Sequence, residues 1–310
     1  ASSAMETLDI NGHPVRKWQI GASTFLAYPE AGARLMNWHL TLADGSYRDV
    51  IYWPEDADLG NIAKVRGGNP VLFPFAARTF DKGEIGYWRA PDGERRPMAQ
   101  HGYCRQGKFE VVTEHDHGFT ASFLPSDECK QAYPYDYTFS VRYRFEQLAF
   151  YVDYQLQNHG STPIPWSAGH HFYFALPWHD GASRSDYQLN VPAKKAFHQD
   201  GEGKLVSVKP FEETNSFDDP SIVDLIRCKL KSNEVRFGPK SGEEDIAIKI
   251  GDARIPSEWT SVVSWTMAED SPFYCVEPWM GPPNSPETKK GLHFVEGGKT
   301  EVFSVEVRLA

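Results

Sequence analysis

The sequence predicts an all-β protein, a large antiparallel β-sandwich with few short helices. Polar and apolar residues alternate with a period of two in several segments, as in strands that have one buried and one solvated face. No segment keeps a 3.6-residue period over the length of a crossover helix, which argues against a parallel βαβ arrangement. Gly, Pro and Asp residues punctuate the alternating segments, as the turns of antiparallel sheets require.

The alternating segments predict individual strands. Apolar residues at alternate positions occur at 119–123, 141–145, 150–156, 246–250 and 303–309. The second and third of these are separated by a short turn and therefore predict a β-hairpin.

Other segments lack this pattern. Residues 220–226 predict a helix of two turns at most, because Pro220 suits a first helical position. Residues 81–96 and 198–219 are polar, contain Gly or Pro, and predict long loops. Residues 1–4 precede Met5 and resemble the remainder of an expression fusion, so we expect a single domain over residues 5–310.

Composition excludes several classes of protein. The chain has 310 residues, of which 40% are hydrophobic and 24% charged, a balance that suits a large globular core. Aromatic residues make up 14% and suit both strand faces and the faces of sugar rings. The net charge is −10 and no basic stripe occurs, so we expect no nucleic-acid partner.

The cysteines and the apolar segments indicate a location. Cys104, Cys129, Cys228 and Cys275 are scattered and form no CxxC pair, so they predict neither a zinc ribbon nor a disulfide framework. No apolar segment approaches the ~18 residues that span a membrane, and no secretory signal is present. We therefore expect a cytoplasmic protein without a membrane partner.

Four segments carry the candidate functional residues: 69–78, 100–105, 169–174 and 273–279. In the last, Glu277 precedes Pro278, which cannot continue a central hydrogen-bond ladder. We therefore expect Glu277 at a strand end or at the rim of a sheet.

The adjacent histidines 170 and 171 must point to opposite faces of an extended segment, so at most one of them faces a given pocket. A zinc site made by His101, one of this pair and Glu277 is an alternative, but the spacing of two that places histidines on one strand face is missing. No GxSxG elbow and no Gly-rich phosphate loop occur, which argues against a serine hydrolase and a nucleotide enzyme. We expect no metal and no cofactor.

Taken in order, these segments resemble the aldose 1-epimerase family, whose fold is the galactose mutarotase-like β-sandwich. The matching motifs are NPVLFPFAAR (69–78), HGY (101–103), HHFYF (170–174) and VEPW (276–279). Residues 133–176 are also similar, and the resemblance extends from about Leu8 to Leu309. The ordered set of motifs is more specific than any one of them.

The resemblance implies a mutarotase, which interconverts the α and β anomers of an aldohexose. Glu277 matches the family's base, which removes the proton of the anomeric hydroxyl, and His171 matches the acid that protonates the ring oxygen. We expect a neighbouring carboxylate to raise the pKa of His171 and keep it protonated near neutrality.

The resemblance also implies a sugar-binding set. Arg78 and His101 match its substrate-binding residues, and we expect Trp279 to form the floor beneath the sugar. Asp219, or its neighbour Asp218, is the candidate for the family's substrate-binding aspartate. The expected partner is a small sugar, and the expected assembly is a monomer or a homodimer.

Three alternatives stay open at this point. A non-catalytic carbohydrate-binding protein would not need His171 and Glu277 together. The second alternative is a glycosidase or a lyase, but a typical glycosidase needs two carboxylates that flank the bond, whereas these motifs supply one carboxylate and histidines. A hexose-6-phosphate 1-epimerase would use cations as phosphate ligands, since guanidinium groups bind phosphate oxygens in pairs; the candidates are Arg78, Arg95, Arg96 and Arg105.

Overall fold

The computed structural model describes residues 3–310 and contains two large antiparallel sheets, which confirms the predicted all-β class. The larger sheet has eleven strands, in spatial order β1 (Ser3–Ile10), β2 (His13–Ile20), β3 (Ser23–Tyr28), β4 (Arg34–Thr41), β5 (Tyr47–Ile51), β15 (Phe172–Ala175), β24 (Phe273–Trp279), β23 (Ser261–Trp265), β20 (Leu225–Leu230), β17 (Ala193–Gln199) and β18 (Leu205–Ser207).

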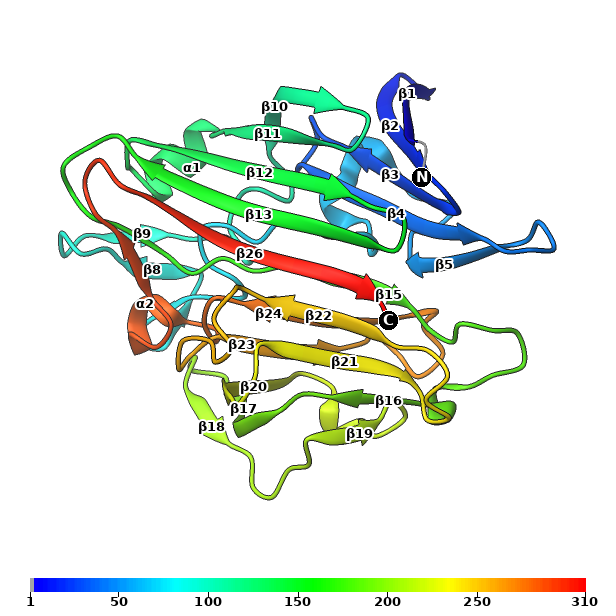
Figure 1. The fold of residues 1–310 in the computed structure, drawn as a ribbon. Helices are drawn as coiled ribbons and strands as arrows, with labels where there is room; N and C mark the ends of the chain where they lie inside the picture. Colours follow the sequence, from blue (N-terminus) through cyan, green and yellow to red (C-terminus); the bar gives the residue numbers. More distant parts are fainter. Residues whose placement is uncertain (1–2) are drawn as a thin grey trace.

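The second sheet has nine strands. In spatial order they are β10 (Lys108–His115), β11 (Gly118–Leu124), β12 (Tyr137–Phe145), β13 (Ala149–Asn158), β26 (Thr300–Leu309), β22 (Ile246–Ile250), β21 (Glu234–Pro239), β16 (Tyr187–Asn190) and β19 (Thr214–Ser216). Strand β26 lies between β13 and β22 and so joins the two halves of this sheet (Figure 1, red). The predicted strands at 119–123, 141–145, 150–156, 246–250 and 303–309 are all members of it.

The remaining elements are short. Three two-stranded pairs are β14 (Ile164–Trp166) with β25 (His293–Val295), β6 (Phe80–Asp81) with β7 (Glu84–Ile85), and β8 (Tyr87–Arg89) with β9 (Arg95–Pro97). The helices are α1 (Asp127–Ala132), α2 (Ser285–Thr288) and the 3₁₀ turns η1 (Leu59–Lys64), η2 (Arg184–Asp186) and η3 (Pro220–Ile222). Within residues 3–310, none of these helices has the length and apolarity that crossing a bilayer would need.

Aromatic side chains join the two sheets face to face. Phe25 of β3 stacks on Phe145 of β12 with ring centroids 4.5 Å apart. Toward the other end of the sandwich, Phe174 of β15 meets Phe237 of β21 at 4.7 Å. One buried apolar cluster contains both pairs, so a single core runs between the sheets. Such pairs add about 0.5–1.5 kcal/mol each beyond the burial of their area.

The helix predicted at residues 220–226 is wrong beyond its first turn. Only the turn η3 forms. Asp219 caps its start, because the Asp219 side chain accepts a hydrogen bond from the Ser221 amide. The chain is extended at Val223 and then enters β20, where Leu225 and Ile226 are buried against β23. Burial of these two side chains in a sheet outweighs a local helical tendency that rested on one proline.

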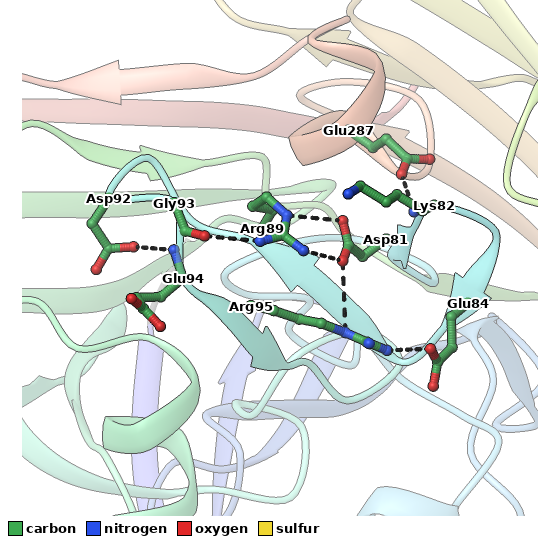
Figure 2. Close-up of polar contacts among 9 residues, drawn as sticks. All are labelled: Asp81, Lys82, Glu84, Arg89, Asp92, Gly93, Glu94, Arg95 and Glu287. Atoms are coloured by element: carbon green, nitrogen blue, oxygen red, sulfur yellow. Dashed lines mark hydrogen bonds and ion pairs between the residues drawn. The ribbon is translucent and has the colours of Figure 1, made fainter.

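The segments predicted as loops also contain short strands. Residues 80–97 form β6 to β9, and an ion-pair cluster holds them together (Figure 2). The half-buried network centres on Asp81, which accepts hydrogen bonds from Arg89, with 2.9 Å between Oδ2 and Nη2, and lies 3.6 Å from Arg95 Nε. Strands of two or three residues are too short for alternation to reveal them. Residues 198–219 likewise contain the end of β17 and all of β18 and β19.

The first strand starts before Met5. Strand β1 begins at Ser3, which is paired with Ile20 of β2, so Ser3 and Ala4 take part in the sheet. Ala1 and Ser2 lie outside the described residues.

A buried arginine holds the connection that follows β5. Arg34 of β4 has no exposed surface, and its guanidinium donates to the carbonyls of Ile62, Val65 and Gly67. Burial lowers its pKa to about 10, so it stays charged at neutral pH. These hydrogen bonds restrain residues 62–67, and this connection leads directly into Asn69.

We predict that Arg34→Leu destabilises the protein by about 3 kcal/mol, because the buried carbonyls of Val65 and Gly67 lose their donor and each unpaired group costs about 1–3 kcal/mol. Urea unfolding followed by circular dichroism measures this. The control is Arg142→Leu on the exposed side of β12, which should change the free energy of unfolding by less than about 0.5 kcal/mol. Equal effects of the two substitutions would contradict the structural role of Arg34.

Candidate active site

A cleft of about 930 Å³ opens over the middle of the eleven-stranded sheet. Its lining includes His171, which immediately precedes β15, and Glu277 of β24. Strands β15 and β24 are antiparallel, with Phe172 opposite Val276, so His171 and Glu277 become neighbours across the ladder. The distance between His171 Nε2 and Glu277 Oε1 is 3.5 Å. The sheet therefore brings together an imidazole and a carboxyl group that are far apart in the sequence.

The expected position of Glu277 at a sheet rim is wrong. Glu277 lies inside β24, between β15 and β23, and its residue surface is 2% exposed. Pro278 is tolerated because β15 begins only at Phe172, opposite Val276, so the regular β15 ladder has ended before Pro278. Pro278 keeps its pairing with Val262 of β23, and its carbonyl accepts a hydrogen bond from the His170 amide.

Burial decides the protonation of this pair. It lowers the pKa of His171 to about 3 and, together with the nearby charge of Asp224, raises the pKa of Glu277 well above its usual range. The neutral form, with the proton on Glu277, is therefore favoured near neutrality. The expectation of a protonated His171 is wrong for this state, because desolvation of the imidazolium is the largest influence on its pKa.

His101 is fixed in one tautomer. Its Nδ1 accepts the amide proton of Ala77 at 2.7 Å, so its own ring proton lies on Nε2. In return, the His101 amide donates to the Ala77 carbonyl at 2.8 Å. These reciprocal bonds join two segments that line the cleft and place Arg78, next to Ala77, in its wall. The His101 ring stands perpendicular to the His171 ring, with centroids 5.7 Å apart.

The buried amide of Asn69 positions both adjacent histidines. Its Oδ1 accepts the His171 amide proton at 2.8 Å, and its Nδ2 donates to Tyr143 Oη at 2.7 Å. The same Nδ2 lies 3.1 Å from His170 Nδ1, which acts as acceptor. Tyr143 belongs to β12 of the other sheet, so one side chain connects the backbone beneath the cleft to the opposite layer of the sandwich.

His170 and His171 point in opposite directions. His170 is fully buried in the core, and its ring packs on Tyr154 with centroids 4.1 Å apart. Its Nε2 has no hydrogen-bond partner within the described residues, and burial lowers its pKa to about 3. His170 is therefore a neutral core residue, whereas His171 faces the cleft.

Trp279 lines the cleft with its indole held in place. Its Nε1 donates to the His170 carbonyl at 3.1 Å. A Cβ atom on Gly169 would lie 2.3 Å from Trp279 Cδ1, so the indole position requires glycine there. The sequence-predicted residues His101, His171, Glu277, Trp279 and Arg78 thus all line one cleft.

Asp219 does not line this cleft. Its carboxylate accepts from the amide and hydroxyl of Ser221 at the start of η3. The cleft contains Asp224 instead, at φ +60° just before β20. Desolvation by the cleft walls raises the pKa of Asp224, and His198 and Arg78 partly oppose this. Sequence reasoning missed Asp224 because it placed this residue within a helix.

Cationic side chains dominate the cleft. Lys64, Arg66, Arg78 and Arg105 line it, and within the part of the chain that the structure describes none has a carboxylate within 4.0 Å. Arg105 and Arg78 were expected here, whereas Lys64 and Arg66 belong to no motif and were missed. Arg95 and Arg96 lie elsewhere, paired with Asp81 and Asp92 respectively. The cleft is therefore locally positive in a protein of net charge −10.

Comparison with known sequences identifies the family that this chain matches. Residues 18–241 match the sequence model described as aldose 1-epimerase. The protein LacX (plasmid) of Lactococcus lactis subsp. lactis is 25% identical over 246 residues, which cover 74% of this chain and 77% of that protein.

Comparison with solved structures supports the same fold. A galactose mutarotase-like protein from Clostridium acetobutylicum superposes with a TM-score of 0.80 at 17% identity, covering 99% of this chain and 98% of the other. A galactose mutarotase-like protein from Lactobacillus casei superposes with a TM-score of 0.74 at 20% identity, covering 99% and 100%. At these identities the likeness concerns the fold alone.

We predict that His170 makes folding stability depend on pH. The unfolded chain binds a proton at this histidine below pH ~6.5, whereas the folded protein binds it only near pH 3. The stability contribution is complete above the unfolded pKa and is lost as pH falls, by about 1.4 kcal/mol between about pH 7.5 and about pH 5.5. His170→Phe should reduce the loss of stability between the two pH values by about this amount, measured by urea unfolding at both, whereas the other buried histidines keep their own contributions. The exposed His117→Gln control should keep the whole loss, and an unchanged pH dependence in His170→Phe would refute the assignment.

Proposed function

The chain belongs to the aldose 1-epimerase family, and we propose that it interconverts the α and β anomers of an aldohexose by acid–base opening and closing of the ring. The observation that carries this proposal is the His171–Glu277 pair, 3.5 Å apart in a cleft large enough for a sugar. Ring opening needs one group that accepts the proton of the C1 hydroxyl and another that protonates O5. This pair supplies one of each.

The proton count of the reaction fits the pair. In its active form Glu277 is a carboxylate and His171 an imidazolium, which differs from the neutral form by one proton transfer across the pair. Glu277 accepts the proton of the C1 hydroxyl, and His171 donates to O5 as the C1–O5 bond breaks. The open aldehyde rotates about C1–C2, and the same two transfers run backwards to close the ring on its other face.

Burial of the pair favours the ring-opened stage of this cycle. After ring opening, Glu277 is protonated and His171 neutral, the form that desolvation stabilises. The charged form before ring opening needs hydrogen bonds from the bound sugar, because the cleft gives the carboxylate few partners. The Oε1 atom of Glu277 is buried without a hydrogen-bond partner within residues 3–310. The protein thus lowers the barrier to ring opening by stabilising the open-chain sugar, in which O5 is a hydroxyl group and C1 an aldehyde.

The other cleft residues position the sugar in this scheme. His101 presents the Nε2 proton that its bond to Ala77 enforces, and this proton suits a hydroxyl or ring oxygen. Trp279 offers an apolar face to the sugar ring. Arg78 and Asp224 line the cleft as a donor and an acceptor for sugar hydroxyls.

We predict that Glu277→Gln and His171→Asn each lower the mutarotation rate about 10²–10⁴-fold. The rate of the double variant should be at most about tenfold below that of the slower single variant, because the two groups act as a unit. Polarimetry of freshly dissolved α-D-glucose and α-D-galactose measures the rates. Asp219→Asn is the matched control, since Asp219 lies outside the cleft, and should keep the wild-type rate. A near-normal rate in either single variant would remove that residue from the mechanism.

A phosphorylated hexose is the second candidate substrate, and the charge of the cleft favours it. Four cations without carboxylate partners face two carboxyl groups, Asp224 and Glu277, of which Glu277 is favoured in its neutral form. Unpaired guanidinium and ammonium groups in a cleft attract anions, and guanidinium binds phosphate oxygens strongly.

We predict that Arg66→Gln and Arg105→Gln raise KM for glucose 6-phosphate by about tenfold or more, equivalent to about 1.4 kcal/mol each. KM for glucose should change less than about threefold in the same variants. NMR exchange spectroscopy on both sugars gives the two values. The control is Arg95→Gln, whose partners lie outside the cleft. Equal changes for both sugars would show that these cations do not contact a phosphate.

A further inference from the structure

We propose that His171, Cys275 and Glu277 form a binding site for a thiophilic divalent cation of the Zn²⁺ class. One nitrogen, one sulfur and one carboxylate oxygen from these residues all lie within 4.8 Å of one another. Cys275 and Glu277 are buried, and the His171 side chain is 12% exposed. Nitrogen, sulfur and carboxylate oxygen are the three ligand types that zinc takes in proteins.

Strand geometry produces this group. Cys275 and Glu277 are two residues apart on β24, so their side chains leave the same face of the sheet. His171 comes from the segment that leads into the neighbouring β15, where Tyr173 is opposite Cys275. The three ligands therefore sit on two adjacent strands of the sheet, which keeps their backbones fixed.

An independent observation points to a ligand at this place. Glu277 Oε1 is buried without a hydrogen-bond partner within the described part of the chain. Buried polar atoms nearly always have partners, so atoms without one need an explanation. A cation bound between this carboxylate and His171 Nε2, which lies 3.5 Å from Oε1, would give Oε1 a partner.

The dimensions suit a tetrahedral ion. Bonds of about 2.0–2.3 Å to nitrogen, oxygen and sulfur place tetrahedral ligands about 3.5 Å apart. The Nε2–Oε1 separation of 3.5 Å already has this value, and the others, at no more than 4.8 Å, reach it when the side chains rotate toward the ion. On binding, the thiol of Cys275 and the carboxyl group of Glu277 release their protons to solvent. The fourth position faces the cleft, because His171 and Glu277 line it, and would accept water or a sugar hydroxyl.

This group differs from the zinc site considered from the sequence. His101 does not belong to it, because its Nδ1 is occupied by the Ala77 amide and its ring is 5.7 Å from that of His171, centroid to centroid. Cys275 takes its place, two residues before Glu277 on β24.

The cation and acid–base catalysis exclude each other. An ion held by His171 and Glu277 removes the acid and the base together, so it inhibits the anomeric interconversion. This consequence rests on the proposed function, whereas binding of the ion does not.

Titration with Co²⁺ alone tests the site, because a thiolate bound to Co²⁺ gives a charge-transfer band in the near ultraviolet. We expect one Co²⁺ per chain with this band, and displacement of the band by Zn²⁺. Cys275→Ser should abolish the band, and Glu277→Gln, which removes a ligand without touching the thiol, should weaken Co²⁺ binding at least tenfold. The matched control is Cys228→Ser, a buried cysteine on β20 whose Sγ lies 3.2 Å from Ser261 Oγ; it should retain the band. Absence of the band in the wild type, or its retention in Cys275→Ser, would overturn the site.

An activity measurement separates the two proposals. Zn²⁺ should inhibit the wild type and the Cys228→Ser variant reversibly, with recovery on adding EDTA. In Cys275→Ser, the Zn²⁺ concentration that halves the variant's own activity should rise at least tenfold. A Co²⁺ band in a protein without mutarotase activity would refute the proposed function and leave the cation site standing. Mutarotase activity that Zn²⁺ does not affect would refute the site and leave the function standing.

Discussion

The position of the two candidate catalytic groups depends on the buried side chain of Asn69. Its amide contacts the backbone of His171, the ring of His170 and the hydroxyl of Tyr143 in the opposite sheet. Its own backbone amide donates to the Leu35 carbonyl of β4. A single polar group satisfied on every side therefore connects both layers at the point where β15 begins. Polar networks of this kind specify one arrangement, because any other leaves a donor or an acceptor unpaired in the interior.

Desolvation and attraction compete in the cleft, and desolvation dominates. Three histidines, His101, His170 and His171, have pKa values lowered by burial, and burial raises the pKa of Glu277. At this one point in the sheet the protein thus favours a neutral pair of His171 and Glu277 over an ion pair. The cations of the cleft, such as Arg66 and Arg78, lie on its exposed walls. The floor is suited to proton transfer and the walls to holding a polar ligand.

The sequence predicted the fold class and most of the candidate site, for identifiable reasons. Strands such as β12 and β13 have one buried face, so alternation marked them directly. His171 and Glu277 were recognised through ordered motifs, which register residue types but not distances or solvation, and the protonation of His171 was accordingly wrong. Asp224 reaches the cleft through left-handed backbone, Lys64 through the 3₁₀ turn η1 and Arg66 through the irregular segment after it, and none of these carries a periodic signal. Asp219 has the residue type expected of a substrate-binding aspartate, but its carboxylate caps the 3₁₀ turn η3.

The place of β26 in the nine-stranded sheet has a consequence for biosynthesis. Strand β26 pairs with β13 on one side and β22 on the other, yet it follows both in the chain. Until residues 300–309 leave the ribosome, β13 and β22 each present an open edge of unpaired amides and carbonyls. Such edges promote pairing with other chains. The nascent chain therefore passes through a stage at which it is prone to aggregate, and completion of this sheet must wait until β26 has been translated.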